Sequence, residues 1–139
     1  MPPYTIWFTH SVSVPLASGN DSSGAFSIRF MDAQGGVAVG GEYTKPNESA
    51  GTAARSSDGG EHWTASTTPP HGYRSAVQWS EPLKLWITAG TNGSDISHDD
   101  GRTWQPLDNG DWNALSLPFI VGPKGRIARL NPAALPPAK

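Results

Sequence analysis

The sequence predicts an all-β fold built from antiparallel sheets. Among its 139 residues, 16 are Gly and 13 are Pro, and this turn-forming content disfavours long helices. Apolar residues alternate with polar ones in several short segments, as they do in strands that bury one face. Similar segments return later in the chain, which is typical of repeat architectures. The length fits one domain.

Two copies of a short motif lie 41 positions apart. The shared positions are Ser56, Asp58, Gly60 and Trp63 in the first copy, and Ser97, Asp99, Gly101 and Trp104 in the second. A repeat of this length is typical of the four-stranded blade of a β-propeller. The sequence therefore predicts propeller blades of four antiparallel strands.

The segments around the motifs divide the chain into about three blades. The first blade covers 26–68, the second 73–107, and an incomplete third covers 112–130 with three strands. A tail follows at 131–139. The segment at about 5–16 also alternates, and it is predicted to be the outer strand of a blade whose other strands lie elsewhere.

The inner strand of the first blade is the clearest case of alternation. Phe26, Ile28 and Phe30 are expected to share one face, and Val37 and Val39 on the next strand to continue the same buried layer.

The connections between strands differ in length. Residues 42–52 are rich in Pro, Asn, Ser and Gly, and they predict a long loop before a third strand at 53–55. In the second blade, Thr91-Asn92-Gly93 predicts a tight two-residue turn.

The repeated motif is expected to be structural. Its Asp is a short carboxylate that accepts N–H groups of its own turn, its Gly permits positive φ, and its Trp anchors the following strand in apolar packing. These roles predict a clipped hairpin rather than a catalytic site.

The motif Ser-x-Asp-x-Gly-x-x-Trp resembles the Asp-box, or BNR repeat, of the sialidase, sortilin and photosystem II assembly-factor-like β-propellers. Longer stretches, among them PLASGNDSSGAFSIRF and VGPKGRIARL, resemble the bacterial assembly-factor-like group, some of which carry the label glycosyl hydrolase. The resemblance runs from about Ser11 to Leu130. It implies the C-terminal part of a longer propeller that acts as a non-enzymatic scaffold or protein-interaction module.

No metal or cofactor is predicted. Oxygens at alternate positions of 95–101 are similar to the start of a calcium loop, but such a loop needs Gly at its sixth position and Glu at its twelfth. Those positions hold Asp100 and Pro106. The four His include no pair at the spacing of a metalloprotease helix.

A sialidase-like glycoside hydrolase or a carbohydrate-binding propeller is the alternative function. Such a hydrolase needs converging arginines, a Tyr nucleophile and a general acid. The chain supplies these residue types at Arg29, Arg55, Arg74, Arg102, Arg126 and Arg129, and at Tyr4, Tyr43 and Tyr73. They form no signature, so no catalytic residue is assigned.

Two candidate binding surfaces remain. Tyr73 and Arg74 open an inner strand, where they would face the channel mouth and grip an anionic or peptide group. The alternative places Tyr73 between blades and Arg74 in solvent. Tyr43 and Lys45 lie in the 42–52 insertion, which is either a second surface or an ordinary mobile loop.

Charge and hydropathy exclude some partners and suggest a compartment. The net charge is −2, so neither nucleic acid nor an anionic membrane is an expected partner, and no segment has the ~20 apolar residues of a membrane span. The N-terminus lacks the pattern of a signal peptide, which predicts a cytoplasmic location. The resembling proteins are often exported, so a piece of one would be periplasmic or secreted.

The incomplete blade predicts self-association. Propellers close with about four to eight blades, and three blades are too few for an ordinary ring. The strand at 5–16 is what the third blade lacks, and a second copy would supply it. We therefore expect a head-to-tail homodimer that forms one six-bladed ring.

Overall fold

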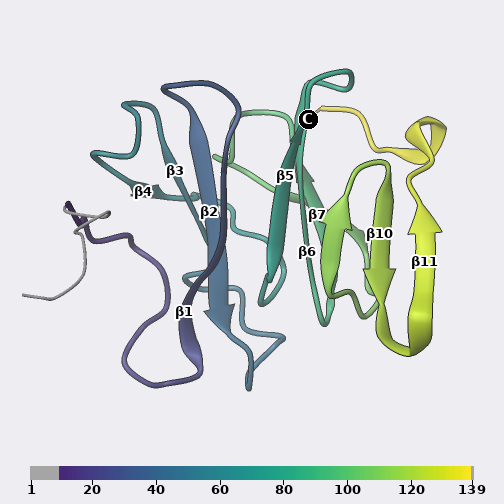
Figure 1. Ribbon diagram of the computed structural model, residues 1–139, viewed down its shortest axis with the longest axis horizontal. Coiled ribbons are helices and arrows are strands. Elements are labelled where there is room, and N and C mark those ends of the chain that lie inside the picture. The colour runs from purple at the N-terminus through teal and green to yellow at the C-terminus, as the bar shows by residue number, and fades with distance from the viewer. Residues whose placement is uncertain (1–9, 139) are drawn as a thin grey trace, which may run out of the picture.

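The computed structural model describes residues 10–138 and folds them into three antiparallel β-sheets that lie side by side (Figure 1). The helical elements of the described residues are two 3₁₀ turns of three residues each, Pro123–Gly125 and Pro132–Ala134. Accordingly, no helix within 10–138 is long and apolar enough to cross a membrane. The all-β prediction is confirmed.

Each sheet is formed by one continuous stretch of chain. The first has the order β1 (Ser23–Phe30), β2 (Gly36–Glu42), β3 (Ala53–Ser56), β4 (Thr64–Ala65). The second has the order β5 (Ala76–Ser80), β6 (Leu85–Gly90), β7 (Gly93–Ser97), β8 (Gln105–Asp108). The third has only three strands, in the order β11 (Arg126–Arg129), β10 (Phe119–Gly122), β9 (Ala114–Ser116). The sheets begin within a few residues of the predicted divisions at 26, 73 and 112.

The turns follow the local sequence. Gly90 pairs with Gly93 across a two-residue connection, and Gly93 has a φ of 136°, a conformation that residues with a side chain rarely adopt. The connection from β2 to β3 is long, since β2 ends at Glu42 and β3 begins at Ala53.

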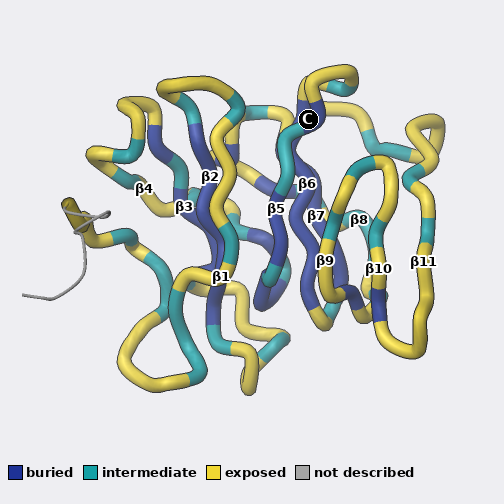
Figure 2. The backbone as a smooth tube through the Cα atoms, in the orientation of Figure 1, coloured by how far each residue is buried: buried dark blue, intermediate teal, exposed yellow. Residues whose placement is uncertain are grey.

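Most of the core lies between neighbouring sheets. The cluster between the first and second sheets consists of Val37, Val39, Ala53, Val77, Trp86 and Trp104. A second cluster, Leu85, Ile87 and Ile96, contacts partly buried leucines that include Leu115 and Leu130 of the third-sheet segment. Figure 2 shows the same pattern, with buried backbone concentrated in β2 and β5 to β7. Each sheet therefore depends on its neighbour to bury an apolar face.

Both ends of the row of sheets carry exposed apolar side chains. On β1, Ile28 is 56% exposed, and on β11, Ile127 is 67% exposed. Val121 pairs with Ile127 across β10 and β11, so the two side chains lie on the same face of the third sheet. We call the faces that carry Ile28 and Ile127 the two open faces.

The register of the first sheet corrects one expectation. Ile28 pairs with Ala38, whereas Arg29 pairs with Val37. Because directly paired residues point to the same side of an antiparallel sheet, Val37 and Val39 lie on the face opposite Ile28. The expected single buried layer is therefore wrong. The two valines pack toward the second sheet, and Ile28 lies on an open face.

The expected outer strand at 5–16 is the other difference. Residues 10–16 belong to no strand, and residues 5–9 lie outside the described part of the chain. Just beyond this segment, the backbone N–H of Ala17 donates to the carbonyl of Gly51 at 3.0 Å. This contact attaches the segment to the end of the 42–52 loop.

Candidate functional site

Several loops meet at the end of the sheets where β2 and β10 finish, the lower end in Figure 1. The backbone N–H of Tyr73 donates to Pro46 O at 3.0 Å, and that of Arg74 to Gly40 O at 2.9 Å. The N–H of Trp112 donates to Gly90 O at 3.0 Å. These bonds join the segments before β5 and β9 to the preceding sheets, and they bring the predicted surface residues to one end of the molecule.

Arg74 is fully buried at this end and is paired with Asp95. Its Nε lies 2.9 Å from Asp95 Oδ1, and its Nη1 donates to Tyr73 O at 2.7 Å and to Asn92 Oδ1 at 2.5 Å. Burial lowers the pKa of Arg74 below its ordinary value, and the Asp95 carboxylate opposes that change. The guanidinium therefore bonds to other groups of the protein interior. It is neither at a channel mouth nor in solvent, the two positions considered from the sequence.

His71 extends the same network toward the surface. Its Nδ1 lies 2.8 Å from Asp95 Oδ2 and 3.1 Å from Nη2 of Arg74, and its Nε2 lies 3.1 Å from Asn109 Oδ1. A His oriented by an Asp is one part of a catalytic triad, which also needs a hydroxyl or thiol nucleophile. Within residues 10–138, no such group hydrogen-bonds to His71. Through Asn92, which also hydrogen-bonds to Asn47, and through Asn109, the network links the segment before β5 to the 42–52 loop and to the connection between β8 and β9.

Tyr43 and Tyr73, predicted on two separate surfaces, lie side by side with Phe26. The ring centroids of Tyr43 and Tyr73 are 6.4 Å apart, and Phe26 is 6.1 Å from the first and 5.1 Å from the second. Tyr73 is buried, and burial, followed by the nearby Tyr43, raises its pKa. Tyr43 and Phe26 are largely exposed, and Lys45 is exposed on the same loop as Tyr43. What reaches solvent here is an aromatic surface rather than a guanidinium.

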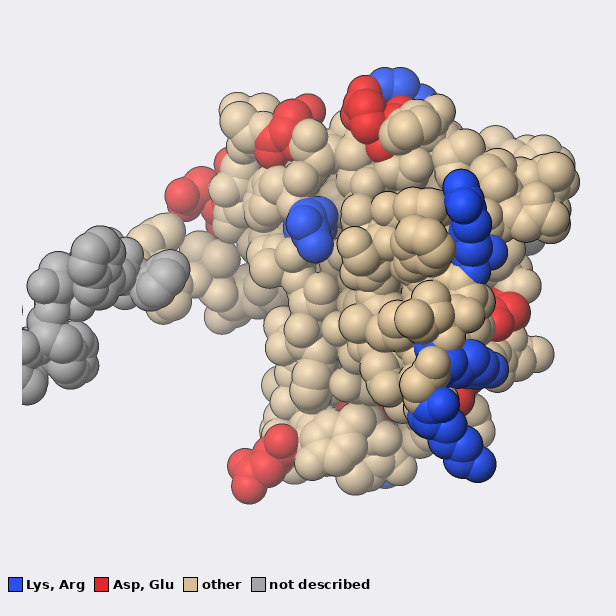
Figure 3. Space-filling view, turned by 45° about the vertical axis from the view of Figure 1, so that its right-hand side comes forward, with Lys and Arg blue, Asp and Glu red and all other residues tan. Residues whose placement is uncertain are grey.

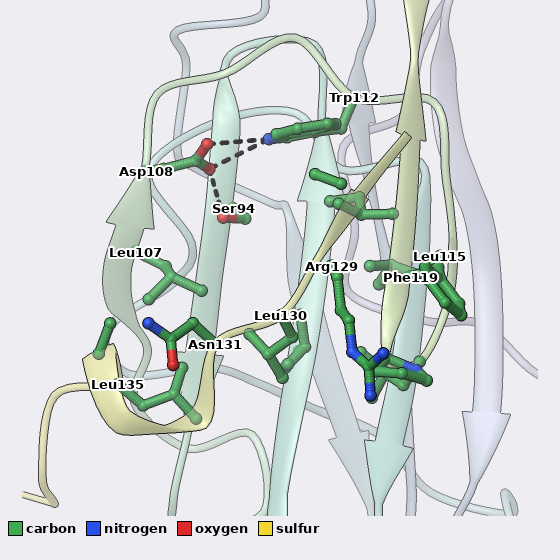
Figure 4. Close-up of a pocket in the computed structure, with 16 residues that line it drawn as sticks. Ser94, Leu107, Asp108, Trp112, Leu115, Phe119, Arg129, Leu130, Asn131 and Leu135 are labelled. Carbon is green, nitrogen blue, oxygen red and sulfur yellow. Dashed lines mark hydrogen bonds between the residues drawn. The ribbon is translucent and has the colours of Figure 1, made fainter. Parts of the chain in front are cut away.

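A hollow of about 220 Å³ separates the second and third sheets (Figure 4). We call it the apolar slot. Most of its wall is aliphatic, formed by Ile87, Leu107, Leu115, Leu117, Leu130 and Leu135.

One end of the apolar slot is polar. The Asp108 carboxylate accepts from Trp112 Nε1 at 3.1 and 3.0 Å, from the Gly110 backbone N–H at 3.2 Å, and from Ser94 Oγ (Figure 4). Both carboxylate oxygens are thus occupied by the protein's own donors. The slot consequently suits an apolar group better than a polar one.

The repeated motifs form two similar turns at the opposite end of the sheets. In the first, Asp58 Oδ1 accepts from Ser56 Oγ and from the His62 N–H, each at 2.9 Å. Ser56 Oγ in turn accepts from the Gly60 N–H at 2.9 Å. The His62 N–H, followed by the His62 side chain, lowers the pKa of Asp58 to about 2. Trp63 is only half-buried and lies edge-on to Phe30.

The second turn repeats these contacts. Asp99 Oδ1 accepts from Ser97 Oγ and from the Thr103 N–H, each at 2.9 Å, and Asp99 Oδ2 accepts from Thr103 Oγ1 at 2.6 Å. Ser97 Oγ accepts from the Gly101 N–H at 2.9 Å. Gly60 and Gly101 have φ values of 92° and 84°. Both carboxylates thus lie within their own turns.

The carboxylates considered for a calcium loop have separate partners. Asp95 bonds to Arg74 and His71, whereas Asp99 bonds within its turn. The described residues hold no group of three or more His, Asp or Glu side chains placed to bind a metal ion.

Comparison with known proteins gives no family. No family model matches the chain. A stretch of 42 residues is 40% identical to a human protein described as uncharacterized and encoded by LINC00311. This stretch is 30% of the chain and spans 35% of that protein's length. The likeness assigns neither a fold nor a function.

Sequence reasoning missed the residues that organise the loop end. Asp95 was considered only as a calcium ligand, and His71, Asp108 and Trp112 were given no role. One signal was available. In the sequence, Asp95 is the only charged residue of the short segment 93–97 between the tight turn and the second motif. A carboxylate that a strand there buries requires a cationic or hydrogen-bonding partner.

We predict that Asp99→Ala lowers the free energy of unfolding by about 1–3 kcal/mol, because the donors of its turn lose their acceptor. The matched control is Asp100→Asn, which changes an exposed carboxylate in the same turn while keeping a side chain that tolerates its φ of 60°. Urea unfolding of both variants checks the prediction. Equal stabilities for the two variants would show that the Asp99 contacts contribute nothing to the fold.

We also predict that Asp95→Ala destabilises the protein by about 3–5 kcal/mol, because it leaves the buried Arg74 guanidinium without its counter-ion. The double variant Asp95→Ala/Arg74→Met should recover part of this loss, since it removes the unpaired charge. Chemical unfolding of the single and double variants measures both effects. A double variant less stable than Asp95→Ala would contradict the assignment.

Proposed function

We propose that this chain is a segment of an Asp-box β-propeller that acts as a non-enzymatic, assembly-factor-like protein-interaction module. The observation that carries the proposal is the pair of similar turns. In each of the first two sheets, a Ser-x-Asp turn with the same hydrogen bonds joins the third strand to the fourth. This equivalence supports reading each sheet as one blade of a repeat protein.

The arrangement of the sheets also supports the proposal. The first strands of successive sheets are neighbours, since β1 contacts β5 and β5 contacts β9. In a propeller, first strands lie closest to the central axis and fourth strands lie at the rim. The ends of the first strands then form a surface for partners, and Phe26, Tyr43 and Tyr73 gather at that position.

The two open faces favour self-association. Stacking the third sheet of one copy on the first sheet of another would cover Ile127 and Ile28, as the sheets within the chain cover one another. Two chains would provide six blades, which lies within the usual range for propellers, and a head-to-tail contact closes into a ring. We therefore propose a homodimer.

Light scattering coupled to size exclusion tests the homodimer. The expected mass is twice 14.7 kDa, because a pair of chains covers every open face. A serine at Ile127 (Ile127→Ser) should shift the equilibrium toward monomer, since it places a hydroxyl in the proposed interface. A stable 14.7 kDa monomer of the wild type at micromolar concentration would refute the dimer.

A carbohydrate-binding or glycoside-hydrolase function is the second candidate. The exposed rings of Phe26 and Tyr43 favour it, since aromatic faces stack on sugars, and the side chains of Asn47 and Asn92 hydrogen-bond to each other nearby. A fluorogenic sialoside separates the two functions. Turnover that is lost in Tyr43→Phe or Tyr73→Phe would support the hydrolase over the interaction module.

A further inference from the structure

The third sheet ends one strand earlier than its neighbours. In the first sheet β4 pairs with β3, and in the second β8 pairs with β7. Among the described residues, β11 pairs only with β10, so its outer edge has no partner strand. An open edge of this kind accepts an extended peptide through main-chain hydrogen bonds.

The edge is strongly basic. Residues 119–130 contain Lys124, Arg126 and Arg129 but no Asp or Glu. Figure 3 shows blue side chains gathered along the side of the molecule that carries β10 and β11. Although the chain has a net charge of −2, this edge would attract an acidic segment.

The side chains of both arginines of β11 reach over the neighbouring segments of the third sheet, where aromatic rings hold them. The guanidinium of Arg126 lies 4.1 Å from the ring centroid of Trp112, and its Nη2 donates to Asp111 O at 2.5 Å. The guanidinium of Arg129 lies 5.7 Å from the Phe119 ring. Positioned in this way, the charges lose little conformational freedom when they meet a partner.

The apolar slot suggests a second feature of the missing strand. In the second sheet, Trp104 directly precedes β8 and packs beside Val37, between the first and second sheets. Val37 pairs with Arg55, which directly precedes Ser56 of the first motif. Ile87 pairs with Ile96, which directly precedes Ser97 of the second motif. Ile87 is thus the counterpart of Val37. It lines the slot between the second and third sheets, so the slot lies where an equivalent Trp would pack.

We propose that the third sheet binds an extended, acidic segment of a partner protein as its fourth strand, with an aromatic side chain at the start of that segment entering the apolar slot. This inference rests on the proposed interaction function and names the chemistry of the partner. The charge of the edge selects this occupant over the N-terminal segment of a second copy, because residues 1–16 contain no Asp or Glu.

Fluorescence anisotropy with labelled synthetic peptides tests the proposal. The probe is a short peptide with one Trp followed by repeats of Glu-Glu-Val, which place Glu on both faces of the added strand because Arg126 and Arg129 point to opposite faces. Its controls are the same peptide with Trp→Ala or with every Glu→Lys. A fourth peptide reproduces residues 1–16. We expect the Glu peptide to bind more tightly than the other three, and the amides of β11 to become protected from hydrogen exchange when it is bound.

Protein variants locate the site. Arg126→Glu/Arg129→Glu should weaken binding of the Glu peptide by about tenfold or more at low salt. Arg102→Glu, which reverses an exposed charge on the β7–β8 turn, should have no such effect. Ala128→Leu narrows the apolar slot, and it should weaken the Trp peptide more than the Ala peptide.

The outcomes distinguish the proposal that the β11 edge binds an acidic strand from the proposal that the protein is a homodimer. If the Glu peptide does not bind, or binds no better than the Lys peptide, the edge proposal fails while the homodimer stands on its own mass measurement. Tighter binding of the peptide of residues 1–16 would overturn the acidic partner in favour of a second copy. Binding of the Glu peptide by a protein that stays monomeric would support the edge and refute the ring.

Discussion

The face-to-face packing of neighbouring sheets is the interaction on which the rest of the structure depends. Trp86 and Trp104 of the second sheet pack against Val37 and Val39 of the first, and none of these side chains is more than 2% exposed. Burying a large side chain stabilises the fold by about 1.5–3 kcal/mol, more than a typical hydrogen bond contributes. Because each sheet needs a neighbour to cover its apolar face, the first and third sheets each keep one apolar face that no described residue covers.

Different hydrogen-bond networks stabilise the two ends of the sheets. At one end, the Asp58 and Asp99 turns satisfy backbone N–H groups and fix where the fourth strands begin. At the other end, the Arg74–Asp95 pair fixes the segment before β5 against β7, and backbone bonds of Tyr73 and Arg74 join that segment to the first sheet. Because the first end is repeated and the second is not, partner recognition would reside in the unrepeated loops and in the open edge of the third sheet.

The sequence predicted local features better than it predicted packing. The strand segments and the tight turn at 91–93 follow from alternation and turn residues, which act within a few positions. The face occupied by Val37 did not follow, because it depends on the register of β1 against β2. The burial of Arg74 was also missed, since its partner Asp95 is 21 positions away and no local pattern links the two residues.

Disulfide trapping tests the head-to-tail stacking of open faces most directly. The chain has no cysteine, so Ile28→Cys on β1 and Ala114→Cys on β9 each introduce a single exposed thiol, one on each open face and each on the first strand of its sheet. In the proposed ring these faces meet, so mixing the two variants under oxidising conditions should yield a cross-linked heterodimer, while each variant alone stays uncross-linked. Cross-linking of either variant with itself, or none in the mixture, would contradict the account.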